Sequence, residues 1–103
     1  MTSLTSKQRP QLRRLAHHLK PVVLVGSDGV TDSLLESVAE AFNTREVLKV
    51  KLQESAPTDA RTAADQIAAR LEGVHPVQTI GRTAVLYRRH PVKPEIRLPS
   101  PGA

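Results

Sequence analysis

Val22-Val-Leu-Val-Gly-Ser-Asp-Gly-Val-Thr31 is the stretch that decides the fold. Its first four residues are apolar and mostly β-branched, and they are too few for a helix, so they predict a buried strand. Gly26 ends this strand. Thr31 is a good N-cap residue, and apolar residues recur at helical spacing from Leu34 to Phe42, which predicts a helix ending near residue 43 or 44. The local order is therefore strand, Gly-x-x-Gly loop, helix.

The loop of Gly26, Ser27, Asp28 and Gly29, called the Gly loop below, is a candidate phosphate-binding site. The first amides of a helix have no partner within it and carry the positive end of its dipole, so they attract phosphate. Two glycines would let a sugar-phosphate chain approach without a Cβ in the way. A strand-to-helix turn that needs glycine only for its dihedral angles explains the same residues, so the motif alone does not decide.

Upstream of this stretch, a helix is predicted from a cap at Thr5 or Ser6 to about Leu19. One face of this helix is mainly apolar and comprises Gln8, Leu12, Leu15, Ala16 and Leu19. Residues 7–20 include five Lys or Arg and no acid, whereas solvated helices usually mix both signs. The cations Lys7, Arg13, Arg14 and Lys20 therefore predict a phosphate-facing surface.

Downstream, residues 47–52 alternate, with Leu48, Val50 and Leu52 on one side and Val47, Lys49 and Lys51 on the other. A helix between this strand and the first implies that the two strands are parallel. A third helix is predicted from a cap at Thr58 to about Glu72. Two further strands, at residues 77–80 and 83–88, flank a hairpin turn at Gly81-Arg82.

The resulting order is αβαβαββ, an α/β two-layer sandwich with a mixed four-stranded sheet. Residues 4–90 are expected to form one domain, and residues 91–103, which contain several prolines, a flexible tail. The formal charge of +5 and pI of about 10.2 favour an anionic partner, either nucleic acid or an acidic membrane surface. The chain has no cysteine, no signal peptide and no apolar run long enough for a membrane span, so we expect a cytoplasmic protein. We also expect it to be a monomer.

Catalytic chemistry is poorly supported. His17 and His18 are neighbours and do not converge on a metal as an i,i+4 pair would. Asp28, Asp32 and Glu36 could hold magnesium, but capping and turn roles explain Asp32 and Glu36 more simply. We predict no enzyme activity, metal or cofactor. A small phosphate- or metal-dependent enzyme using the Gly loop, and a basic protein-interaction module, remain as alternatives.

The scarcity of aromatic residues sharpens the nucleic-acid hypothesis. Phe42 and Tyr87 are the only aromatic residues, so no row of stacking rings can read single-stranded RNA. Glycine, helix and lysine contacts address backbone phosphate instead, which predicts salt-sensitive binding to structured RNA.

Five segments, residues 4–8, 15–23, 26–32, 48–51 and 80–88, carry a family resemblance in their order and gaps. The chain resembles the CRM domain, the chloroplast RNA splicing and ribosome maturation module, in its free-standing bacterial YhbY-type form. The resemblance implies a fold similar to the C-terminal domain of a bacterial translation initiation factor, with a KH-like GxxG loop. It also implies non-catalytic RNA binding, since bacterial single-domain members associate with precursors of the large ribosomal subunit.

Transferred by position, the resemblance implies that Gly26, Ser27, Asp28 and Gly29 form the RNA-contacting loop. The basic surface around this loop would consist of Lys7, Arg13, Arg14, Lys20, Lys49 and Lys51. One departure matters, because loops of this family often carry a basic residue between the glycines. The carboxylate of Asp28 would weaken the attraction for phosphate at that point.

Overall fold

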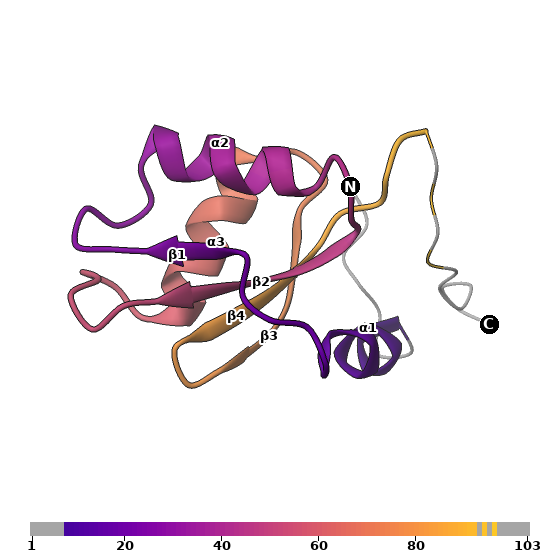
Figure 1. Cartoon of the computed structure of the whole chain (residues 1–103), viewed down its shortest axis with the longest axis horizontal. Helices are drawn as coiled ribbons and strands as arrows, with labels where there is room; N and C mark the ends of the chain where they lie inside the picture. The colour runs from indigo at the N-terminus through magenta and orange to yellow at the C-terminus, as the bar shows by residue number, and fades with distance from the viewer. Residues whose placement is uncertain (1–7, 93, 95, 97–103) are drawn as a thin grey trace.

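A computed structural model describes residues 8–92, 94 and 96 (Figure 1). The element order αβαβαββ is as predicted: α1 (Gln8–Ala16), β1 (Val23–Val25), α2 (Asp32–Ala41), β2 (Val47–Leu52), α3 (Ala60–Arg70), β3 (His75–Ile80) and β4 (Thr83–Tyr87). The strands form one mixed sheet in the order β1-β2-β4-β3. β1 and β2 are parallel and the other pairs are antiparallel, which confirms the predicted α/β fold.

The larger core lies between the sheet and the helices α2 and α3 (Figure 1). The fully buried side chains here include Val25, Val50 and Leu86 from the sheet and Val38 and Ile67 from the helices. The small residues of α3 contribute as well, since Ala60, Ala63 and Ala64 are at most 3% exposed. Alanine on the inner face lets the helix lie close to the strands.

Helix α1 packs on the opposite face of the sheet, which adds a partial third layer to the predicted two. Leu12 and Ala16 are both 0% exposed and pack in a second cluster with Val47, Val77, Val85 and Tyr87. The Arg9 guanidinium donates to the carbonyls of Pro76 (3.0 Å) and Val77 (2.8 Å), at an irregularity in β3. α1 thus explains why Val47 is buried although it shares a face with Lys49 and Lys51.

The prediction that residues 22–25 form a buried strand is wrong for half of its side chains. Val23 and Val25 are buried, but Val22 is 43% and Leu24 57% exposed. β1 is an edge strand whose inner side faces α2, while α1 on the outer face packs against β2, β3 and β4. The outer face of β1 is therefore open to solvent.

The boundaries of α1 also differ from the prediction. The helix ends at Ala16 rather than near Leu19, and the side chains of Leu15 and Leu19 are 46% and 39% exposed. Its buried residues, Gln8, Leu12 and Ala16, are spaced by four. Leu15 is exposed because it lies at the edge of this narrow stripe, and Leu19 is exposed because it lies beyond the end of the helix. The predicted cap at Thr5 or Ser6 lies outside the described residues.

The two other helices differ in how well their caps were predicted. Thr31 caps α2 as expected, since its Oγ1 accepts the amide of Leu34 at 3.1 Å. α3 is capped by Asp59 rather than Thr58: the carboxylate accepts the amide of Thr62 at 2.7 Å, and this hydrogen bond lowers the pKa of Asp59. α3 ends at Arg70, just before the predicted Glu72. Both Thr58 and Asp59 are good capping residues, so the sequence leaves a one-residue ambiguity here.

After β4, the chain returns along the connection between α2 and β2. The carboxylate of Glu46, only 5% exposed, accepts the amides of His90 (2.8 Å) and Ile96 (2.7 Å). Ile96 also packs against the α1 cluster. Most of the predicted tail, residues 91–103, lies outside the described residues, and its expected flexibility stays a prediction.

Candidate nucleic-acid interface

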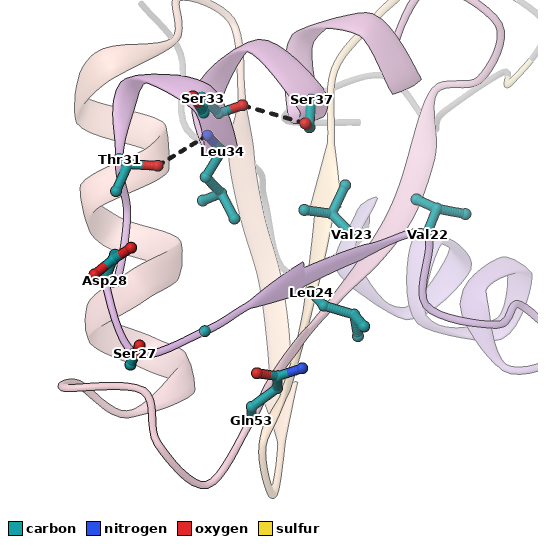
Figure 2. Close-up of a pocket in the computed structure, with 12 residues that line it drawn as sticks. Val22, Val23, Leu24, Ser27, Asp28, Thr31, Ser33, Leu34, Ser37 and Gln53 are labelled. Carbon is teal, nitrogen blue, oxygen red and sulfur yellow. Dashed lines mark hydrogen bonds between the residues drawn. The ribbon is translucent and has the colours of Figure 1, made fainter.

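The Gly loop joins β1 to α2 at the end of the sheet away from α1 (Figure 1). The amide of Gly29 donates to the carbonyl of Gly26 at 3.0 Å and closes a tight turn. The amide of Gln53 donates to the carbonyl of Val25 at 2.9 Å, which ties the start of the loop to the segment after β2. Ser27 and Asp28 are exposed at the tip of the loop (Figure 2).

The two glycines have different structural roles. Gly29 has a φ of +71°, and a Cβ there would lie 2.9 Å from Cγ of Pro57. Gly26 is not among the glycines with positive φ, and a Cβ there would lie 3.3 Å from Oε1 of the flexible Gln53 side chain. The turn explanation therefore accounts for Gly29. Neither the backbone conformation nor the packing requires a glycine at position 26. The absence of a side chain there leaves the backbone accessible.

Replacing each glycine by alanine should separate these roles. Gly29→Ala is expected to lower the free energy of unfolding by about 1–3 kcal/mol, because alanine is strained at positive φ and its Cβ would collide with Pro57. Gly26→Ala should change stability by less than about 1 kcal/mol, since the Gln53 side chain can move. Urea denaturation of both variants measures the difference, and equal losses would contradict it.

Part of the hydrogen-bonding capacity of the α2 N-terminus is used by the protein itself. Helix α2 begins at Asp32, three residues after Gly29, and the amide of Leu34 already donates a hydrogen bond to Oγ1 of Thr31. Within the described part of the chain, the amides of Asp32 and Ser33 make no hydrogen bond. The Asp32 carboxylate pairs with the Arg70 guanidinium at 3.0 Å. A phosphate could therefore accept hydrogen bonds from two amides here, whereas an uncapped helix would offer the amides of its entire first turn.

A shallow groove of about 590 Å³ extends from the Gly loop between β1 and α2 (Figure 2). Its α2 wall carries the hydroxyl residues Thr31, Ser33 and Ser37, and Ser37 donates to the carbonyl of Ser33 at 3.1 Å. Leu24 and Gln53 line it on the other side. The groove combines hydroxyl groups and exposed apolar surface, but no basic side chain of the described residues lines it.

Five of the six predicted cations lie on or next to α1 and on β2. Arg13 and Arg14 are exposed on α1 and Lys20 on the segment that follows, while Lys49 and Lys51 alternate with buried residues of β2 and so point away from α2 and α3. We call these five residues the basic band. Its α1 part packs on the side of the sheet to which the lysines of β2 point. Figure 1 shows that β1 and β2 lead from the side of α1 to the end of the sheet where the Gly loop lies. Lys7 lies outside the described residues.

The helices on the two faces of the sheet differ in net charge. α1 contains three arginines and no acidic residue, whereas α2 and α3 together contain four acidic residues and only two arginines. Because α1 and α2 pack on opposite faces, the face of the basic band is the one that attracts polyanions. Arg9 belongs to α1 but bonds to carbonyls of β3, so its role is structural.

The residues considered for metal binding lie apart or have other partners. Among the described residues, no group of three or more His, Asp or Glu side chains lies together as a metal site would require. The rings of His17 and His18 pack edge to face, with centroids 5.0 Å apart.

No helix in the described ranges is long and apolar enough to cross a membrane.

Two contributors to the site were missed from the sequence. Gln53 lies beside Gly26 because the parallel register pairs Val25 with Leu52, and Leu24 borders both the groove and the basic band. The signal for Gln53 was its position directly after β2, at the same end of the sheet as the loop. The register that brings the two together cannot be obtained from either segment alone.

Comparison with known proteins shows similarity over nearly the whole chain. The CRS1/YhbY (CRM) domain matches residues 4–88. A probable RNA-binding protein of Pseudomonas aeruginosa is 38% identical over 86% of this chain and 85% of its own length, and the probable RNA-binding protein YqeI of Bacillus subtilis is 38% identical over 93% and 99%. The solution structure of a hypothetical Staphylococcus aureus protein, to which RNA binding has been ascribed, superposes with a TM-score of 0.78 at 30% identity, covering 93% of this chain and 99% of that one.

Proposed function

Since the chain belongs to the CRS1/YhbY (CRM) domain family, we propose that it is a non-catalytic protein that binds structured RNA through the Gly loop and the basic band. The names of the relatives from Pseudomonas and Bacillus support RNA as the partner. The observation that carries the proposal is the difference in net charge between the helices on the two faces, together with the lysines of β2 on the same face as α1. Such contacts position a protein on a phosphate backbone and read little sequence.

The RNA that we propose is precursor ribosomal RNA of the large subunit, bound during ribosome assembly in the cytoplasm. The resemblance to bacterial single-domain members of the family supports this choice. Sedimentation of a cell lysate through a sucrose gradient tests it. The protein is expected to travel with incomplete large subunits and to leave them at raised salt, because phosphate contacts are screened. A protein that stays at the top of the gradient at low salt would contradict the ribosomal partner.

The contribution of the Gly loop can be tested at Asp28, which is exposed at its tip. Asp28→Lys is expected to tighten binding of structured RNA by about threefold to tenfold at low salt and to steepen the salt dependence by about one unit, because one phosphate contact is gained. Asp65→Lys, an equal charge change at an exposed position of α3, is the matched control. If both variants gain equally, or neither gains, the loop is only a turn.

A further inference from the structure

One row of side chains crosses the open face of the sheet through all four strands. Leu24 of β1 is level with Lys51 of β2, Lys51 with Thr83 of β4, and Thr83 with Ile80 of β3. Residues level with one another in neighbouring strands point to the same side of a sheet. The row is about 14 Å long, because neighbouring strands lie about 4.8 Å apart.

The ends of this row are apolar and exposed. Leu24 and Ile80 are each 57% exposed, while Thr83 is half-buried and Lys51 is exposed between them. Leu24 points away from α2, opposite to Val23 (Figure 2). α1 packs against the next part of the same face, on Val47 and Val85, and so leaves this row uncovered. We call Leu24, Lys51, Thr83 and Ile80 the sheet-face row.

Charge indicates which kind of molecule would cover the row. The strand positions that point to this side carry Lys49 and Lys51 and no Asp or Glu. These lysines are two residues apart on one strand, about 6.6 Å along its axis, which suits successive phosphates of one nucleic-acid strand. An acidic peptide would also meet the lysines, but the row continues the basic band and reaches Leu24, which lines the groove of the Gly loop.

We infer that unpaired nucleotides of the bound RNA lie across the sheet-face row, with bases or riboses on Leu24 and Ile80 and phosphates at Lys49 and Lys51. This inference rests on the proposed RNA-binding function and adds a partly apolar contact to it. Exposed aliphatic side chains can take the place of the aromatic rings that most single-strand binders use, because each base presents a face that loses water on contact. The row therefore favours a junction between a duplex and an unpaired segment over a plain duplex.

The test compares two fluorescently labelled RNAs, a hairpin with an unpaired oligouridine tail and the same hairpin with a blunt end. Leu24→Thr combined with Ile80→Thr removes most of the exposed apolar area and places β-branched threonine, which suits a strand, at both positions. We expect about tenfold weaker binding of the tailed hairpin and a much smaller loss for the blunt one, because Leu24 also lines the groove of the Gly loop. The salt slope should be unchanged for both, because no charge is lost. Methyl resonances of Leu24 and Ile80 should shift in the wild-type protein when the tailed RNA is added.

Val92→Thr, at a side chain that is 76% exposed outside the sheet, is a control for an apolar-to-polar change away from the sheet-face row. If the wild-type protein binds both RNAs and the double variant binds each of them as tightly as the wild-type protein does, the inference is overturned while the proposed function stands. If the wild-type protein binds neither RNA, the proposed function itself fails. If the methyl groups respond to an acidic peptide and not to RNA, the row is a protein-docking surface and the inference is likewise overturned.

Discussion

Replacing Arg13 and Arg14 together by glutamate is expected to weaken binding of structured RNA by about tenfold to a hundredfold at low salt. Both side chains are exposed on α1 and lie in the basic band. Each lost phosphate contact should lower the slope of log affinity against log salt by about one unit, so the double variant should be flatter by about two. Fluorescence anisotropy over a range of salt concentrations measures both quantities.

The control for this double variant is Arg61→Glu combined with Gln66→Glu and Ala69→Glu, an identical change in net charge at exposed positions of α3 that leaves the Arg70–Asp32 pair intact. α3 packs on the other face of the sheet from α1, so its cations are not part of the basic band. Equal losses in the α1 variant and the α3 control would mean that overall charge, and not the band, attracts the RNA. Circular dichroism should show that both proteins keep their helix content, because exposed substitutions affect stability little.

Leu12→Ala is expected to lower the free energy of unfolding by about 2–5 kcal/mol, the range for removing a buried leucine side chain. Leu12 is 0% exposed and lies at the centre of the α1 cluster with Val47 and Val85. A helix of nine residues is too short to persist in water without such packing. RNA affinity should therefore fall as well, since Arg13 and Arg14 would no longer be held on the sheet.

Leu15→Ala is the matched control, because it makes the same chemical change on the same helix at a side chain that is 46% exposed. It should cost less than about 1 kcal/mol. Urea denaturation measures both variants, and amide hydrogen exchange in α1 shows whether the helix is released before the rest of the protein unfolds. If Leu15→Ala is as destabilising as Leu12→Ala, the assignment of the buried stripe of α1 is wrong.

Local sequence signals predicted most elements of the fold. Thr31 identified the start of α2 because its hydroxyl can satisfy an amide three residues ahead, an interaction contained within a few residues. Gly81, with a φ of +57°, identified the hairpin between β3 and β4 for a similarly local reason. The errors concern non-local packing: the outer face of β1 was expected to be buried, and Leu15 and Leu19 were expected to pack.

For the candidate site, the binding role of the Gly loop and of the cations stays a prediction. The sequence suggested a basic surface around the loop, and the structure places the described cations on or next to α1 and on β2, on one side of the sheet. The position of α1 decides this difference. The apolar stripe of α1 indicates that the helix packs against other apolar residues, but it does not indicate which face of the sheet they belong to.

The sequence by itself determined the order of helices and strands, the parallel pairing of β1 with β2, and the basic character of α1, because each depends on neighbouring residues or on the length of one connection. The tertiary structure alone decided that α1 lies opposite the acidic α2, that β1 is an edge strand with an exposed Leu24, and that Gly29 is required by its φ while Gly26 is not. These features depend on strand register and on which surfaces exclude water together. Both arise only when segments distant in the chain are packed against one another.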